Sequence, residues 1–248
     1  MTAVVNNANA IIADSAVVCA EAILIGPHHI EIGESCIFHP GSRVEAISGP
    51  IFFGRDNVVE EGALIRNGNQ DLAMRIGNGN LFEVRSRAEN LVEVGNRNIF
   101  EVNSSVVAKP QGRQDQIGKG SLWLPSMLLS RVGSGCIIGA NVSISARYAG
   151  AEGEGRETKR DDGTRTAVSP DNKNTNPNAA RPIVVDDGLI FPTNAYGEAV
   201  VGGRTDHATD VEAERNHSKL IEVLKESLPK FHHLRRTASP TGGSTLQR

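Results

Sequence analysis

Three glutamates stand at repeated positions in this 248-residue chain and could support chemistry. Glu60, Glu83 and Glu101 each lie seven residues after the start of a six-residue motif. If the motifs stack, the carboxylates lie about 4.8 Å apart on neighbouring strands, as an acid/base pair would require. Adjacent like charges are also mildly unfavourable in a ladder, so a solvated face, a protein-contact face and an acid/base site all stay open. The nearby arginines that could neutralise this column are Arg66, Arg85, Arg87 and Arg97.

Histidine is the second residue type that could carry chemistry, as a zinc ligand or a general base. A catalytic zinc site needs three converging ligands and an open position for water. Residues 60–106 contain no histidine, which argues against zinc catalysis, and His39 alone is a thin basis for an acyl-transfer base. The seven histidines are His28, His29, His39, His207, His217, His232 and His233.

Cysteine completes the set of candidate reactive side chains. Cys19, Cys36 and Cys136 are odd in number and lack the CxxC spacing of metal or redox sites. Because free cysteine is usually buried, we predict reduced thiols that fill the interior. We expect no catalytic, cofactor-binding or metal-binding residue.

The element that must position these residues is a repeat. IGNGNLFEV (residues 76–84) recurs as VGNRNIFEV (residues 94–102), an offset of 18. Apolar residues return every six positions, which fits neither the period of a helix nor that of a strand. Three flat sides make one coil, so Ile76 should lie on Val94 and Phe82 on Phe100 in a dry interior. The hexad runs are Ile32, Phe38 and Val44; Phe53, Val59 and Ile65; Ile76, Phe82, Ala88, Val94, Phe100 and Val106; Ile117, Trp123 and Leu129; and Val132, Ile138 and Ile144.

These hexads predict a mainly β fold, a left-handed parallel β-helix shaped as a triangular prism. The handedness follows from resemblance to that fold class, because the spacing does not set it. Glycine often follows the apolar position, and Asn57, Asn80 and Asn98 lie four residues after it. Both residue types tolerate left-handed backbone angles, so we expect them to turn the chain at the corners. The glycines are Gly33, Gly54, Gly77, Gly95, Gly118, Gly133 and Gly139.

The chain divides into five segments. β-Helix coils occupy residues 1–147, and residues 148–181 form a polar insertion without Ile, Leu, Phe or Met, which predicts disorder. A last coil follows at 182–204, then a helix at 205–234 packed on one face of the prism and a flexible basic tail at 235–248. The tail contains Ser239 before proline, a possible phosphosite.

The predicted C-terminal helix is amphipathic. Thr209 and Glu212 have the spacing of a capping box, and Pro229 should end the regular stretch. Such a helix cannot bury its stripe alone, so it either covers one face of the prism or docks on another protein. The stripe is Leu220, Ile221, Leu224 and Leu228.

Composition excludes several classes of function. The net charge of −3 and pI of about 6.2 give no general attraction to nucleic acid or acidic membranes. Apolar runs fall short of the roughly 18 residues that span a bilayer. The first basic residue is Arg43, so a secretory leader is not expected. These features predict a soluble intracellular protein.

Left-handed β-helices host two familiar enzyme classes, the hexapeptide acyltransferases and the gamma-class carbonic anhydrases. Arg55 and Asp56 in FGRDNVVEEGALI resemble the structural Arg and Asp of the second class. Members of that class also carry two zinc-binding histidines five residues apart, a spacing that this chain lacks. An enzyme of either class remains the alternative to a noncatalytic scaffold.

Five segments together resemble the dynactin subunit 6 family, left-handed β-helices of the dynactin pointed-end complex. The resemblance covers residues 11–147 and 182–237. The insertion at 148–181 and two extra residues near Leu24 depart from the family. The segments are IADSAVVCAEAILIG, ISGPIFFGRDNVVEEGALIRN, IGNGNLFEV, SGCIIGANVSI and LPKFHHLRRT.

The resemblance implies a function without catalysis or cofactors. It implies dynactin subunit 5 as a β-helical partner, with the pointed-end actin-related protein and dynactin subunit 4 as neighbours. It also implies a cytoplasmic, microtubule-associated location, indirect contact with dynein adaptors, and support for endosome transport. Phosphorylation of the family's basic tail would map onto Ser239.

Overall fold

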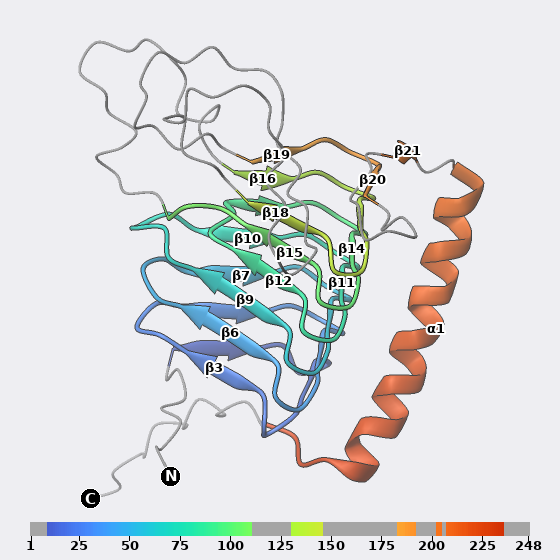
Figure 1. Ribbon diagram of the computed structural model, residues 1–248. Helices are drawn as coiled ribbons and strands as arrows, with labels where there is room; N and C mark the ends of the chain where they lie inside the picture. The colour runs from blue at the N-terminus through green and yellow to red at the C-terminus, as the bar shows by residue number, and fades with distance from the viewer. Residues whose placement is uncertain (1–8, 111–129, 146–182, 192–201, 205–206, 236–248) are drawn as a thin grey trace, which may run out of the picture.

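The computed structural model describes residues 9–110, 130–145, 183–191, 202–204 and 207–235. There the chain winds into a three-sided prism of short parallel strands, with one long helix along its side (Figure 1). Successive strands go in turn to three sheets. Sheet 1 contains β1 (Ala10–Ile12), β4 (Ile30–Ile32), β7 (Ile51–Phe53), β10 (Met74–Ile76), β13 (Glu93–Val94), β16 (Arg131–Val132) and β19 (Val184–Val185). Sheet 2 contains β2 (Val17–Val18), β5 (Ile37–Phe38), β8 (Val58–Val59), β11 (Leu81–Phe82), β14 (Ile99–Phe100), β17 (Ile137–Ile138), β20 (Leu189–Phe191) and β21 (Gly202–Arg204). Sheet 3 contains β3 (Ile23–Ile25), β6 (Arg43–Ala46), β9 (Leu64–Asn67), β12 (Arg87–Glu89), β15 (Ser105–Val107) and β18 (Ser143–Ser145).

The interior is the stack of hexad positions that the sequence predicts. Ile76 pairs with Val94 and Phe82 with Phe100 on adjacent coils, and the two phenylalanine rings stack at 4.7 Å between centroids. Every predicted inward position among the described residues belongs to one buried core. The run Ile117, Trp123 and Leu129 lies outside the described residues. The predicted left-handed parallel β-helix is confirmed.

Insertions between coils gather at one corner. The steps from sheet 1 to sheet 2 and from sheet 2 to sheet 3 keep the six-residue spacing, as from Ile32 to Phe38 to Val44. The return from sheet 3 to sheet 1 varies in length, from the short link Ala88–Val94 to the long links Val106–Val132 and Ile144–Val185. The chain therefore absorbs extra residues at this corner, corner 3–1, without changing the stacking register of the other two sides.

The corners correct the role predicted for glycine. Gly77 and its equivalents do not have positive φ; they lie where neighbouring coils approach closely. A Cβ on Gly77 would lie 2.5 Å from Asn96 Oδ1 and 2.7 Å from the carbonyl oxygen of Gly95. Left-handed angles at the corner between sheets 1 and 2, corner 1–2, belong instead to Ser35, Asp56, Gly79, Arg97 and Gly135. Gly118 lies outside the described residues.

The single described helix, α1 (His207–Phe231), packs along the outer face of sheet 2 (Figure 1). The predicted stripe supplies its contacts, because Ile221 and Leu228 are buried there and Leu224 packs beside them. The apolar side chains that they cover on sheet 2 are Val17, Cys19, Ile37 and Val58.

The two local signals, the capping box at Thr209 and Pro229, do not mark the ends of the helix. The helix begins at His207, so Thr209 lies inside the first turn and not at the N-cap. It continues through Pro229 to Phe231, and the N–H of His232 still donates to the carbonyl of Leu228 at 2.9 Å. Proline removes one helical hydrogen bond, and the burial of Leu228 against sheet 2 offsets that loss.

Segments on either side of α1 close both edges of sheet 2. Before the helix, β21 pairs antiparallel with β20. After it, residues 232–235, which we call the C-terminal hook, pair antiparallel with the edge of β2 at Cys19 and Leu234. The N–H of Ala20 donates to the carbonyl of His233, and that of Arg235 to the carbonyl of Val18, both at 2.7 Å. Strand edges left open invite pairing with other chains, so this closure protects sheet 2.

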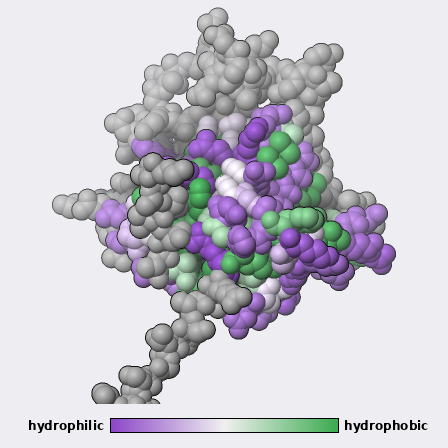
Figure 2. All heavy atoms as spheres, turned by 90° about the horizontal axis from the view of Figure 1, so that it is seen from below, coloured by the Kyte–Doolittle hydropathy of each residue, from purple (hydrophilic) through white to green (hydrophobic). Residues whose placement is uncertain are grey.

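At the first coil, the outermost strands of sheets 1 and 3 keep an open edge. Among the described strands, β1 and β3 each pair on one side only. Figure 2 views this end of the prism and shows hydrophobic surface between hydrophilic residues. Ile11 is 59% exposed, and the inward-facing Ala10 and Ile12 are only partly buried.

The insertion at 148–181 and nearly all of the tail at 235–248, including Ser239, lie outside the described residues. The segment boundaries at 147, 181, 204 and 234 remain predictions.

Candidate functional site

The three predicted glutamates do form one column, at the corner between sheets 2 and 3. Each follows the inward residue of its coil, and each side chain accepts a backbone N–H from the next coil. Glu60 Oε2 accepts from Val84 at 3.2 Å and Glu83 Oε2 from Val102 at 3.1 Å. Glu101 Oε2 accepts from Ala140 at 2.8 Å. The carboxylates therefore fasten successive coils together.

Electrostatics at this column reflect partial burial. Burial raises the pKa of Glu60 above its ordinary 4.5, the neighbouring Glu83 raises it further, and the Val84 N–H lowers it. Burial likewise raises the pKa of Glu83. The proposed neutralisation by arginine is wrong for three of the four arginines, which pair elsewhere: Arg66 with Glu45 at 3.6 Å, Arg87 with Glu89 at 2.6 Å and Arg97 with Glu214 at 3.6 Å.

The described histidines are spread over the molecule. His39 lies one coil before Glu60 in the same column; burial lowers its pKa, His232 on the hook lowers it further, and Glu61 raises it. His217 lies on α1 and contacts the backbone of corner 1–2. Within the described ranges, no group of three His, Cys, Asp or Glu side chains lies close enough to hold a metal ion.

The cysteines are buried and free. Cys36 and Cys136 fill the prism as predicted, whereas Cys19 lies on the outer face of sheet 2 beneath α1. Burial raises the pKa of the Cys19 and Cys36 thiols to about 11. Since the thiolate is the reactive form, these protonated thiols are poor nucleophiles and metal ligands.

Arg55 and Asp56, matched above to carbonic anhydrases, form a solvent-exposed pair at 3.7 Å. Asp56 serves the fold, since it holds a left-handed corner and its carbonyl oxygen lies 2.7 Å from His217 Nε2. Lys225 Nζ donates to Ser35 Oγ at the same corner, at 2.7 Å. Polar contacts therefore tie one flank of α1 to corner 1–2.

A groove opens between the N-terminal half of α1 and sheet 2. It has a volume of about 780 Å³. Its floor is apolar, formed by the outward side chains of Leu81, Ile99 and Ile137, and its rim includes Arg97 and Glu214.

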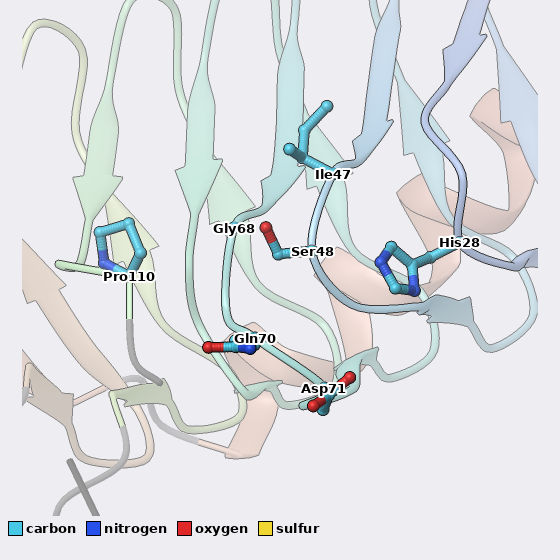
Figure 3. A pocket seen from close by; sticks show the side chains of 7 residues that line it. All are labelled: His28, Ile47, Ser48, Gly68, Gln70, Asp71 and Pro110. Atoms are coloured by element: carbon cyan, nitrogen blue, oxygen red, sulfur yellow. The ribbon is translucent and has the colours of Figure 1, made fainter. Parts of the chain in front are cut away.

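A second recess lies at corner 3–1, where four loops meet (Figure 3). Its volume is about 510 Å³ and its lining is mostly polar. The N–H of Asp71 donates to the carbonyl of Ser48 at 2.9 Å and joins two of these loops. The lining residues are His28, Ile47, Ser48, Gly68, Gln70, Asp71 and Pro110.

Comparison with known proteins points to one group of relatives. The chain is 43% identical to dynactin subunit 6 of Caenorhabditis elegans over 77 residues, which are 31% of this chain and 42% of that protein. It is 32% identical to dynactin subunit 6 of Nematostella vectensis over 142 residues, 53% of this chain and 64% of that one. The chain is a sequence relative of dynactin subunit 6. No protein-family model matches it.

These relatives extend beyond the matched region, because the chain spans 42 to 64% of their length. A similar fold is found among the solved structures. A hexapeptide transferase family protein from Anaplasma phagocytophilum superposes with a TM-score of 0.54 over 88% of this chain and 93% of that one, at 10% identity. That likeness shows the fold alone.

Sequence reasoning missed the two features that shape the surface of sheet 2. The hook is four residues long, and its antiparallel pairing with β2 has no local signal. The groove did have one: residues 211–219, VEAERNHSK, contain Val211 and Ala213 as their only apolar side chains, too few to cover three coils.

Proposed function

We propose that this chain is a noncatalytic assembly subunit of the dynactin pointed-end complex. Its sequence relation to dynactin subunit 6 carries the proposal. In this role it pairs with the β-helical dynactin subunit 5, lies beside dynactin subunit 4 and the pointed-end actin-related protein, and supports dynein adaptors and endosome cargo on microtubules. The location is the cytoplasm.

Several features of the fold support an assembly role. Stacked coils form a rigid body, and α1 with its flanking segments closes one of the three sheets. Within the described residues, no helix covers the outer faces of sheets 1 and 3, which we propose are used for other contacts. The glutamates bond to backbone amides and the thiols are held protonated by burial, so these groups serve the scaffold.

The column of Glu60, Glu83 and Glu101 is the proposed edge of a partner-contact face. Its carboxylates remain partly exposed at a corner, and a basic partner surface would relieve their mutual repulsion. Phosphorylation at Ser239 would add negative charge to a basic tail and is the proposed point of regulation.

Within the described part of the chain, no helix combines the length and the apolar composition that a membrane crossing requires.

Purification of the tagged full chain from its own cells tests the proposal. Mass spectrometry should find dynactin subunits, with dynactin subunit 5 in stoichiometric amount. A homotrimer with stoichiometric zinc and no dynactin subunit would overturn the proposal and favour a hexapeptide-repeat enzyme.

A further inference from the structure

The outer face of sheet 2 carries one continuous apolar column. Its members pair in register from coil to coil, so they lie one above another. The column is Val17, Ile37, Val58, Leu81, Ile99 and Ile137. Val17, Ile37 and Val58 are buried under the C-terminal half of α1, whereas Leu81, Ile99 and Ile137 are partly exposed and form the floor of the groove.

The helix cannot cover the second half of the column, because its own apolar stripe begins only at Leu220. Side chains from Val211 to Asn216 are all exposed, and Val211 itself is 51% exposed. Polar contacts hold this half beside the groove: Arg97 pairs with Glu214 across the rim. The column is thus built for apolar contact along its whole length and receives it from α1 over only half.

We propose that this groove binds an amphipathic helix of another protein, lying along the prism axis as α1 does. The inference rests on the proposed function only in taking the chain to be an interaction subunit. Continuity with the existing interface supports it, since α1 shows how a helix fills the same column: Ile221 and Leu228, two turns apart, both bury their side chains there.

Spacing favours a helix over a strand as the occupant. Rungs of the column are about 4.8 Å apart. One helical turn advances about 5.4 Å, so residues at i, i+4 and i+7 reach successive rungs. In a strand that lies along the axis, residues on the same side are about 6.6 Å apart, so their positions no longer match the rungs by the third rung.

The chemistry of the groove favours a bound helix whose contacting side chains are uncharged. Two ion pairs lie on the rim, Arg97 with Glu214 and Arg55 with Asp56, and Glu222 adds one further carboxylate. The floor itself is formed by Leu81, Ile99 and Ile137 and carries no ionisable side chain, so leucine and isoleucine side chains fit its chemistry.

A peptide of residues 214–231 of this chain is the probe, because its stripe already fits the column. Labelled with a fluorophore and a photo-crosslinker, it should bind the full chain saturably in an anisotropy titration and crosslink beside Ile99 and Ile137. Ile99→Asp should weaken binding at least about tenfold, the loss of one apolar anchor. Val107→Asp, an equivalent change on sheet 3, should leave binding unchanged, and an Ile221→Glu peptide should not bind.

Three results would overturn the inference. The first is peptide binding that neither Ile99→Asp nor Ile137→Asp changes, in variants with unchanged circular dichroism. The second is crosslinks confined to Val17 and Ile37, which would mean that the peptide displaces α1, and the third is a homodimer that Ile99→Asp dissociates, which would assign the groove to a second copy. Absence of saturable binding to the wild-type chain would overturn it too. A chain that copurifies with dynactin yet does not bind the peptide would refute this inference alone, and a chain that binds the peptide without copurifying would refute the proposed function alone.

Discussion

The side-chain amide of Asn80 donates to Oδ1 of Asn57 at 2.9 Å, and both side chains are fully buried. Asn98 donates to Oδ1 of Asn80 in the same way at 3.0 Å, and Oδ1 of each asparagine also accepts the backbone N–H of the next coil. The ladder runs between the buried Cys36 and Cys136. A buried amide is costly unless it is paired, so each rung depends on the next.

Breaking this ladder should destabilise the prism. Asn80→Leu removes the acceptor for both the side-chain and backbone N–H groups of Asn98. Each of these two buried donors costs about 1–3 kcal/mol when left unpaired, so the free energy of unfolding measured in urea should fall by roughly 2–6 kcal/mol. Asn78→Ser is the matched control on the exposed ladder: Ser134 already fills the equivalent position and accepts the N–H of Asn96 at 3.0 Å, so that change should be nearly neutral. Equal losses for the two variants would contradict the argument.

The inward positions could be predicted because burial leaves the sequence little choice. Residues such as Phe82 and Phe100 face only other side chains, so apolar identity recurs every six positions. The corners could not be predicted in the same way. Arg85 and Arg97 adopt left-handed angles although an arginine side chain does not favour them; the hydrogen bonds between coils fix the backbone there. Gly77 is glycine for a different reason, the close approach of the next coil.

The groove on sheet 2, like the corners, could not be predicted from the sequence. The stripe of α1 was predicted from the sequence, whereas the column of Leu81, Ile99 and Ile137 on the outer face of sheet 2 was not identified there. The offset between stripe and column could not be predicted, because it depends on where β21 and the hook attach the helix to the prism. The groove arises from that offset.

Replacing glycine by asparagine at two positions should separate the two roles of glycine, which are close approach of the next coil and a left-handed backbone angle. Gly77→Asn should destabilise the fold by about 2 kcal/mol or more, because its Cβ would meet Asn96 and the backbone of Gly95 within 2.7 Å. Gly41→Asn should be nearly neutral, since Asn103 and Asn141 adopt the left-handed angle at the same corner. Thermal melts of both variants provide the comparison, and similar melting temperatures would mean that close approach does not matter at Gly77.

Phe100 should tolerate no charge. It is fully buried and stacks on Phe82, so Phe100→Asp would place a carboxylate in the dry interior at a cost of several kcal/mol. We expect the circular dichroism spectrum of an unfolded chain. Phe100→Leu keeps the site apolar and should fold with a lower melting temperature; a folded Phe100→Asp chain would show that water reaches the core.

Deletion of residues 152–178 should scarcely move the melting temperature. This stretch joins β18 to β19 at corner 3–1, the corner that accepts insertions elsewhere in the prism. Loop closure changes by only about 0.6 kcal/mol per doubling of length. Calorimetry of the shortened and full chains checks this, and a large drop on deletion would assign the segment a structural role.

Mild acid should stabilise the glutamate column. Because the folded chain raises the pKa of Glu60 and Glu83 above 4.5, it binds more protons than the unfolded chain between that value and the raised ones. The contribution of these groups to stability is therefore complete below pH 4.5 and is lost as the pH rises through their folded pKa values. Glu60→Gln keeps an acceptor for Val84 and removes the charge, so it should stabilise the protein at pH 7 and lose that advantage toward pH 4.5. Urea titrations across this range, with the exposed Glu222→Gln on α1 as control, measure the difference; a constant gap between wild type and Glu60→Gln would show that the column does not titrate in this way.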